Sequence, residues 1–440
     1  MDFRFDMARA ETLGEIKTAI KVTLKHRYAD LLPKDKKAGV LIKPDLNSNM
    51  NSLTGNTTDL RVIAALLEFL RDEGYVNVVV GEGANVGFFG SGISAISGLR
   101  VDLLARHYGY EARDLNCSEP RWVDLENGVK AGVAREVIES AMLINLAKLK
   151  THFGSGMAVC LKNMMGCLVG RADNKKIYGA LADNVVDLNL AIKPTLHIVD
   201  GVISMEGSGP TRGIPIKTGT LFFGTDPFIV DLVCARFVSF SPEQVAPLRV
   251  AIKRGIITEE HLRFAEEFPL SVTYRFKPPK AGPLATLIHG RRLRFPAIRN
   301  TAMFDRICSS ELGVRILCAT GFRQDVSLKE EMECEGISID DQKCKGCKKC
   351  ADYCPIGMAM PESAGNGHSS GNGHNPEKGD SPEKDGSSGK DHSPEKNHSQ
   401  CIHCLYCFCV CPKDAIVFHG KLGFMEEQLR QYDEIIKQIF

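Results

Sequence analysis

Half of the sixteen cysteines in this 440-residue chain fall into two runs of identical spacing near its C-terminus. The runs consist of Cys344, Cys347, Cys350 and Cys354, followed by Pro355, and of Cys401, Cys404, Cys407 and Cys411, followed by Pro412. Three thiolates spaced three residues apart can each bind a different iron of one iron-sulfur cube, and the proline after the fourth cysteine fixes φ and donates no hydrogen bond. The spacing therefore predicts two 4Fe-4S clusters, cofactors that carry single electrons.

The fourth cysteine of each run is expected to bind the cluster of the other run, as in two-cluster ferredoxins. The expected ligand sets are Cys344, Cys347, Cys350 and Cys411 for one cluster, and Cys401, Cys404, Cys407 and Cys354 for the other. Zinc usually takes two separated C-x2-C pairs, and disulfides need an oxidising compartment, so neither alternative fits these runs well. Cys409 lies off the ligand spacing and is expected to be a packed thiol, with ligand exchange as the alternative.

Charge and composition narrow the classes of partner. The chain has 55 basic and 54 acidic residues, so no net field favours nucleic acid or an anionic membrane. Residues 1–9 mix acids and bases where a signal peptide would be apolar, and no run approaches the ~20 apolar residues of a membrane span. We therefore expect a cytoplasmic protein whose partner is a redox protein or a small-molecule substrate, with no nucleic acid and no membrane span.

Short apolar segments alternate with helical periodicity over the first 240 residues, which predicts an α/β domain. Strands are expected at residues 37–43, 76–80, 142–145, 196–199 and 220–223, and helices at residues 60–70, 155–165, 184–192 and after Asp226-Pro227. A strand, a helix and a second strand at this spacing form a parallel, right-handed unit. We therefore expect a mostly parallel sheet with helices on both faces, and the pattern leaves the strand order open.

Polar residues follow five of the expected strands. Ligands of open α/β sheets bind beyond the carboxyl ends of the strands, so these residues should share one rim. The expected ligand-binding residues are Lys43, Asn47, Lys148, Lys150, Lys162 and Asn163, and the expected proton-transfer residues are Glu82, His152 and Asp200, with Asp226 after the fifth strand.

Several of these residues also have a purely structural interpretation. Asp226 before a proline is typical of a helix cap, and Gly81-Glu82-Gly83 is typical of a turn, because the next glycine, Gly87, breaks the G-x-G-x-x-G spacing. Residues 148–152 could form a solvated loop, and Lys162 could extend its amine from an otherwise apolar helix to solvent.

The chain divides into three expected parts: an α/β domain at residues 1–260, a connecting layer at 261–335, and a small α+β ferredoxin-type domain at 336–440. The connecting layer carries a basic patch at Arg291, Arg292 and Arg294. Residues 361–399 repeat Gly-Asn-Gly-His and Pro-Glu-Lys, a low-complexity composition that predicts a disordered insert. Residues 424–440 have the spacing of an amphipathic helix that packs on another part of the chain.

Several short segments resemble the proteins of domain of unknown function 362, many of which carry a C-terminal ferredoxin module. These segments are Lys43-Pro44 with Asn47, Gly81-Glu82-Gly83, residues 145–152, residues 162–166, Asp200-Gly201 and residues 205–210. The resemblance covers roughly residues 38–255. It implies that the rim residues form a site, and it brings no reaction with it.

Two functions from different classes are compatible with these patterns. In the first, the chain is an oxidoreductase in which clusters exchange single electrons with a substrate or cofactor at the rim, lysines bind an anionic group, and Glu82, His152 or Asp200 moves protons. In the second, the chain is a non-catalytic electron carrier or sensor whose large domain docks a partner. Convergence of acids, bases and an interior lysine at the rim would favour the first.

Overall fold

A computed structural model describes residues 3–83, 94–126, 128–170, 180–279, 331–358 and 401–440. The expected insert at 361–399, the basic patch at 291–294 and most of the expected connecting layer lie outside the described residues.

Among these residues, the main sheet has eight strands. They are β1 (Phe5–Arg9), β2 (Val40–Pro44), β3 (Val78–Glu82), β4 (Glu111–Asp114), β7 (Met142–His152), β8 (Gly156–Ala158), β9 (Leu196–Glu206) and β10 (Ile214–Gly224). The strand order is β1-β10-β9-β7-β2-β3-β4, with β8 paired to β7. Strands β9, β7, β2, β3 and β4 are parallel, whereas β10 pairs antiparallel with both β9 and β1, so β1 again runs in the direction of the parallel strands. The predicted mostly parallel α/β fold is confirmed.

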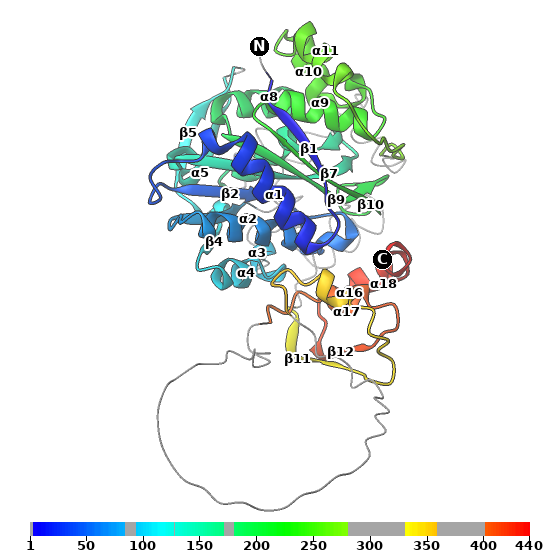
Figure 1. The fold of residues 1–440 in the computed structure, drawn as a ribbon. Helices are drawn as coiled ribbons and strands as arrows, with labels where there is room; N and C mark the ends of the chain where they lie inside the picture. The colour runs from blue at the N-terminus through cyan, green and yellow to red at the C-terminus, as the bar shows by residue number, and fades with distance from the viewer. Residues whose placement is uncertain (1–2, 84–93, 127, 171–179, 280–330, 359–400) are drawn as a thin grey trace, which may run out of the picture.

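Helices cover both faces of the sheet (Figure 1). One face packs on α1 (Leu13–Arg27), α2 (Leu60–Asp72), α3 (Ala95–Gly98) and α4 (Val101–His107); the other packs on α5 (Arg135–Glu139), α6 (Cys160–Asn163), α8 (Leu181–Ile192), α9 (Pro227–Phe237), α10 (Ala246–Lys253) and α11 (Glu259–Glu267). Successive strand residues point to opposite faces, so Leu41 and Ile42 enter different cores. Full burial of such a side chain contributes about 1.5–3 kcal/mol, which fixes the register of the strand.

Two predicted elements differ from the structure. Residues 155–165 form the short strand β8, helix α6 and the 3-10 turn Met164–Cys167 instead of one helix, because β8 pairs with the extended end of β7. Strand β10 lies antiparallel to β9, with Gly224 opposite His197, so Asp226 lies at the amino end of the parallel strands. Asp226 is therefore a helix cap and does not belong to the rim: its Oδ1 accepts the N–H groups of Phe228 and Ile229 at 2.7 and 3.1 Å.

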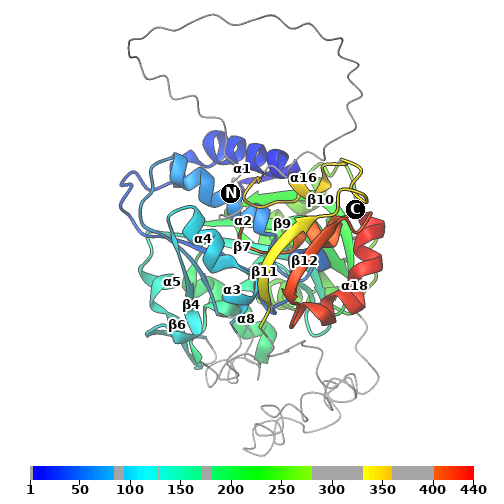
Figure 2. The same ribbon diagram turned by 90° about the horizontal axis from the view of Figure 1, so that it is seen from below.

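The C-terminal module packs on the α/β domain. It comprises β11 (Glu333–Ile339), α16 (Lys349–Asp352), α17 (Tyr406–Val410), β12 (Ile416–Lys421) and α18 (Met425–Ile439), and a second small hairpin, β5 (Pro120–Asp124) with β6 (Lys130–Ala134), lies elsewhere. Helices α16 and α17 face the α/β domain, and the β11–β12 hairpin lies on the far side (Figures 1 and 2). Tyr406, Val410 and Tyr432 join the same apolar core as α2, so the module and the domain share one hydrophobic interior.

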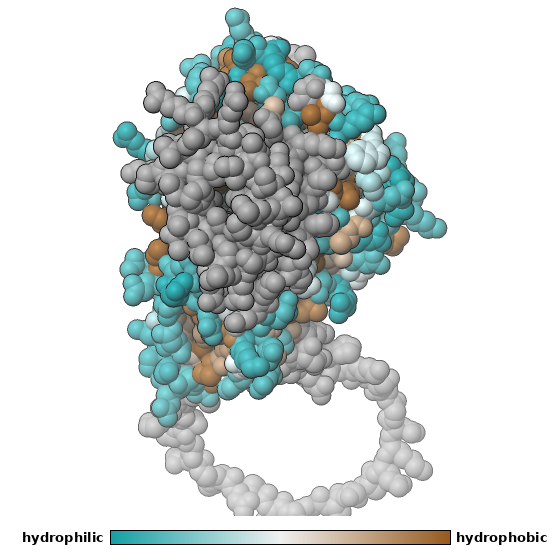
Figure 3. Space-filling view, turned by 180° about the vertical axis from the view of Figure 1, so that it is seen from behind, coloured by the Kyte–Doolittle hydropathy of each residue, from teal (hydrophilic) through white to brown (hydrophobic). Residues whose placement is uncertain are grey.

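The visible described surface on the back of the molecule is mostly hydrophilic, with apolar residues scattered over it (Figure 3). Within the described ranges, no helix combines the length and the apolar character that a bilayer crossing requires.

The first prediction tests the structural role of Asp226. Replacing Asp226 with Ala removes the acceptor of two N–H groups at the start of α9, so the free energy of unfolding should fall by about 1 kcal/mol. Urea denaturation followed by circular dichroism measures this loss. The control Asp72→Ala removes an exposed carboxylate near the end of α2 and should change stability by less than about 0.5 kcal/mol.

Candidate functional site

The carboxyl ends of β2 and β3 bring a lysine and a glutamate together inside the protein. Lys43 Nζ donates to Glu82 Oε2 at 2.8 Å and to Asn163 Oδ1 at 2.8 Å, and only 1 % of Lys43 is exposed. The N–H of Leu46 also donates to Glu82 Oε2, at 3.0 Å. An ion pair so far from water persists only when its remaining hydrogen-bonding capacity is satisfied, and these contacts provide that.

Two glycines allow the loops around this pair to approach each other. The N–H of Gly83 donates to the carbonyl of Gly166 at 2.8 Å. A Cβ atom on Gly166 would lie 1.8 Å from Glu82 Oε1 and 2.7 Å from Lys43 Nζ, and one on Gly83 would lie 2.6 Å from the Gly166 carbonyl oxygen. The need for glycine at both positions is therefore steric.

Two further buried ion pairs involve lysines of β7, one paired with an acid of β9 and the other with an acid that follows β2. Lys148 Nζ donates to Asp200 Oδ2 at 2.9 Å, and both side chains have no exposed surface. Lys150 Nζ contacts Asp45 Oδ2 at 2.8 Å and donates to Asn47 Oδ1 at 3.2 Å. The carboxyl edge of the sheet thus holds three lysine–carboxylate pairs, contributed by residues that are widely separated in the chain.

Burial shifts the pKa values of the acids and lysines at this edge of the sheet. Burial raises the pKa of Glu82 to about 7, against the opposing effect of Lys43. Burial lowers the pKa of Lys162 to about 8 although Asp45 opposes the shift, and Lys150 and Lys43 lower it further. The pKa of Lys150 is also lowered by burial, with Asp45 opposing. A carboxyl group and an amine that both titrate near neutral pH are suited to proton transfer and to pH-dependent anion binding.

Most of the residues predicted at the rim are brought together, and one is set apart. Lys43, Glu82 and Asn163 form one hydrogen-bonded group, while Lys150 reaches Asn47. His152 lies at the β7–β8 turn, where its Nδ1 accepts the N–H of Gly154 at 3.0 Å and its ring stacks on Phe153.

Sequence reasoning missed several members of this network. Asp45, directly after β2, pairs with Lys150, and Asp59 pairs with Arg61 at 2.7 Å with neither side chain exposed. Burial alone would raise the pKa of Asp59, but Arg61 and Lys148 more than offset this effect and hold it below its usual value. The available signal was an arginine on the otherwise apolar face of a predicted helix, since a charge there needs a partner.

The two cysteine loops have the same backbone conformation. Positive φ angles occur at Gly346 and Lys348 in the first loop, at 66° and 61°, and at His403 and Leu405 in the second, at 53° and 60°. The fourth cysteine of each run also accepts an N–H from four residues later: Met358 donates to Cys354 Sγ at 3.4 Å, and Ala415 donates to Cys411 Sγ at 3.2 Å. Repeated left-handed turns and N–H···S bonds fit the demands of an iron-sulfur cluster, whose sulfur atoms are stabilised by backbone donors.

The thiols divide into two neighbourhoods. The pKa of Cys404 is raised by burial and by the nearby thiols of Cys407, Cys354 and Cys401. The pKa of Cys350 is raised by burial and by Cys347 and Cys344. Cys354 thus lies near the second run, which is the arrangement that crossed ligation requires, while Cys409 is buried beside it.

No group of three or more His, Cys, Asp or Glu side chains within the described residues is arranged to hold a single metal ion.

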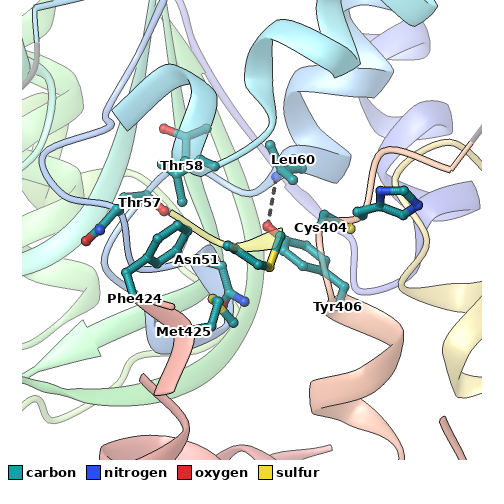
Figure 4. A pocket seen from close by; sticks show the side chains of 13 residues that line it. Asn51, Thr57, Thr58, Leu60, Cys404, Tyr406, Phe424 and Met425 are labelled. Carbon is teal, nitrogen blue, oxygen red and sulfur yellow. Dashed lines mark hydrogen bonds between the residues drawn. The ribbon is translucent and has the colours of Figure 1, made fainter. Parts of the chain in front are cut away.

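The ferredoxin module docks on the edge that holds the lysine–carboxylate pairs. The N–H of Leu60, at the start of α2, donates to Tyr406 Oη at 3.2 Å (Figure 4). Ser52 Oγ lies 2.5 Å from the same oxygen. The neighbouring N–H of Asp59 donates to Asp200 Oδ2 at 2.7 Å. The cavity left at this contact is about 10 Å³, barely the space for one water, so the contact is a packed interface and not a substrate pocket.

The fold and the cysteine loops define the class: an α/β domain joined to an iron-sulfur module for electron transfer. Residues 336–412 match the 4Fe-4S dicluster domain, and residues 40–236 match the domain of unknown function DUF362. The chain thus carries a DUF362 domain followed by a 4Fe-4S dicluster domain, as its motifs predicted, and it is an iron-sulfur electron-transfer protein.

Two individual proteins are also similar to this chain. It is 28 % identical over 130 residues to the thylakoid-associated protein sll1697 of Synechocystis sp., covering 28 % of this chain and 40 % of that protein. The lactate racemase apoprotein from Thermoanaerobacterium thermosaccharolyticum aligns with a TM-score of 0.34 and 13 % identity, over 53 % of this chain and 56 % of that one. The chain therefore spans less than half the length of the curated relative that it matches.

The second prediction tests the close approach at Gly166. Gly166→Ala places a methyl group against Glu82, which cannot retreat without losing its bonds to Lys43 and Leu46. The free energy of unfolding should fall by about 1–3 kcal/mol, measured by urea denaturation. Gly14→Ala, where no atom lies within 4 Å of the new Cβ, is the matched control and should not destabilise the protein. Equal effects of the two changes would contradict the steric argument.

The third prediction tests the crossed ligation. Anaerobically reconstituted protein should contain about eight irons, and Cys354→Ser should damage the cluster bound by Cys401, Cys404 and Cys407. Iron analysis and electron paramagnetic resonance (EPR) spectroscopy measure both outcomes. Cys409→Ser is the control and should leave both clusters intact. Damage confined to the cluster of Cys344, Cys347 and Cys350 would refute the crossing.

Proposed function

We propose that this protein is an iron-sulfur oxidoreductase that acts on an anionic substrate or cofactor at the carboxyl edge of its sheet. The dicluster module supplies single electrons when its clusters are bound. The α/β domain binds the anion and exchanges protons with it. The observation that carries the proposal is that the dicluster module packs against the edge at which the buried acids and lysines gather.

The lysines at the carboxyl edge of the sheet support an anionic ligand. Lys162 lies on α6, within electrostatic reach of Asp45, Lys150 and Lys43, and is only partly exposed, so an anion that reached it would meet little competition from water. Lys43 pairs with Glu82 and Lys150 pairs with Asp45, and these pairs set the local field and position the loops. We assign direct binding to Lys162 because its side chain is more exposed than those of Lys43, Lys148 and Lys150.

Glu82 is the proton-transfer group that this geometry favours. Its raised pKa, about 7, lets it hold or release a proton under ordinary conditions. Asp200 instead accepts bonds from Lys148 and from the N–H groups of Asp59 and Val202, which suits a positioning role. For a two-electron reduction, two single electrons and two protons enter the substrate, and Glu82 relays the protons from solvent.

A protein that only carries electrons would not need the buried acids and lysines at the carboxyl edge of the sheet. A carrier has no use for a carboxyl group and an amine that titrate near neutral pH and share Lys43 and Asp45 as charged neighbours. Anaerobic purification followed by mass spectrometry of small molecules that accompany the protein would identify the ligand class directly.

The fourth prediction tests Lys162 with phosphate and oxalate as probe anions. Affinity should be highest near pH 6 and fall as the pH rises through 7 to 8, because Glu82 becomes negative and Lys162 then loses its positive charge. Lys162→Met should weaken binding at pH 6 by roughly ten- to a hundredfold, the usual worth of a hydrogen bond to a charged group. Isothermal titration calorimetry under nitrogen measures both effects.

Lys21→Met, an exposed lysine on α1, is the control and should leave the affinity unchanged. Glu82→Gln should remove the part of the pH dependence near 7 and leave the part near 8. Unchanged affinity in Lys162→Met, with both clusters present, would return Lys162 to a structural role and favour the carrier function.

A further inference from the structure

The two cysteine loops share one backbone conformation, but the side chains of one are cationic and those of the other are mostly apolar. Between its cysteines, the loop at residues 344–350 carries Lys345, Lys348 and Lys349 and no acid. The loop at residues 401–407 carries Ile402, His403, Leu405 and Tyr406 at the corresponding places. Cluster binding needs only the shared backbone and the thiols, so the difference in side chains has another cause.

The cationic loop faces solvent. Lys345, Cys347 and Lys348 are exposed, and within the described chain neither Lys345 nor Lys348 has an ion-pair partner. The nearest preceding acids are Asp340 and Asp341, and Asp340 is engaged with Lys343 at 3.5 Å. Unpaired lysines at an exposed cluster loop produce a local positive potential next to the cluster position.

The apolar loop faces the α/β domain. Leu405 is 1 % exposed and Tyr406 is fully buried, with its hydroxyl bonded at Ser52 and Leu60. Tyr353, directly before Cys354, lies beneath the guanidinium of Arg61, whose Cζ is 4.2 Å from the centre of the tyrosine ring. Cys354 belongs to the same thiol neighbourhood as the second loop. Both tyrosines therefore connect one cluster position to the start of α2.

From α2 the connection continues to the rim. Asp59 pairs with Arg61, and its N–H donates to Asp200, which pairs with Lys148. The cluster position at Cys354, Cys401, Cys404 and Cys407 is thus the one joined to the rim by packed and hydrogen-bonded groups. The other position adjoins the solvent-exposed cationic loop.

We propose that the loop at residues 344–350 is the docking surface for an acidic electron-carrier protein, and that the loop at residues 401–407 is the internal end of the module, turned toward the rim. Each encounter oxidises the carrier by one electron and reduces this chain by one, with no proton transfer at the docking surface. Two encounters supply the two electrons of the rim reaction. The inward direction of transfer rests on the proposed rim function, whereas the docking surface does not.

The docking surface is tested by charge reversal in the full, cluster-loaded chain. The probe is a reduced acidic flavodoxin, mixed with the protein by stopped flow at low ionic strength. The double variant Lys345→Glu, Lys348→Glu should be reduced about tenfold more slowly than the unchanged protein, and the steep decrease of the rate with added salt should disappear. Reduction by the methyl viologen radical, a small cation, should not be slowed.

The matched control is Lys421→Glu, a charge reversal at an exposed lysine of the β11–β12 hairpin in the same module. Its rate with flavodoxin should stay close to that of the unchanged protein. Equal rates for the double variant and the unchanged protein, or equal slowing by both variants, would overturn the docking surface.

The order of the two cluster positions is tested by potentiometric EPR titration, with Cys347→Ser and Cys404→Ser used to assign the signals. Arg61→Gln removes a buried positive charge near Tyr353, so the midpoint potential of the inner cluster alone should become more negative. A shift of both clusters, of neither, or of the outer one alone would overturn the order.

Because Arg61→Gln leaves Asp59 as an unpaired buried charge and could prevent folding, the unchanged protein provides a second measurement. A soluble paramagnetic chelate should broaden the EPR signal of the outer cluster and spare that of the inner one, and equal broadening would refute the order. These readouts do not use the rim ligand, so failure of Lys162→Met to affect anion binding would remove the rim function while leaving the order of the clusters testable.

Discussion

The buried pair of Lys148 and Asp200 is the interaction on which both halves of this protein depend. Neither side chain is exposed, so loss of one partner would leave an uncompensated charge inside the protein, at a cost of about 3–5 kcal/mol. Asp200 also accepts the N–H of Asp59 and thereby fixes the start of α2. Since Tyr406 of the ferredoxin module binds at the same helix start, the position of the module follows from an ion pair between two strands.

The carboxyl edge of the sheet is the place where the two faces of the α/β domain meet. Lys148 and Asp200 reach toward α2 on one face, while Lys43 contacts Asn163 of α6 on the other. Glu82, on the neighbouring strand β3, accepts bonds from both Lys43 and the backbone of Leu46. Charged groups at this edge act on one another: burial raises the pKa of Glu82, Lys43 opposes that shift, and Asp45 adds to it.

The ferredoxin module shows how one backbone can present two environments. Its two cysteine loops have left-handed residues at the same positions, so both offer similar N–H groups to sulfur. Their surroundings differ because Leu405 and Tyr406 enter the shared apolar core, whereas Lys345 and Lys348 remain in water. The asymmetry of the module thus arises from packing against its neighbour.

The sequence by itself determined the features that depend on local spacing. The cysteine runs, the parallel unit of β2, α2 and β3, the cap at Asp226 and the helix at the C-terminus all follow from contacts within a few residues or from one periodicity. Tertiary structure alone decided the antiparallel direction of β10, the short α6, the partners of Asp45 and Arg61, and the side of the domain on which the module docks. The reason is physical: apolar periodicity shows that a strand is buried but not which way it runs, and a buried charge requires a partner without specifying which distant residue provides it.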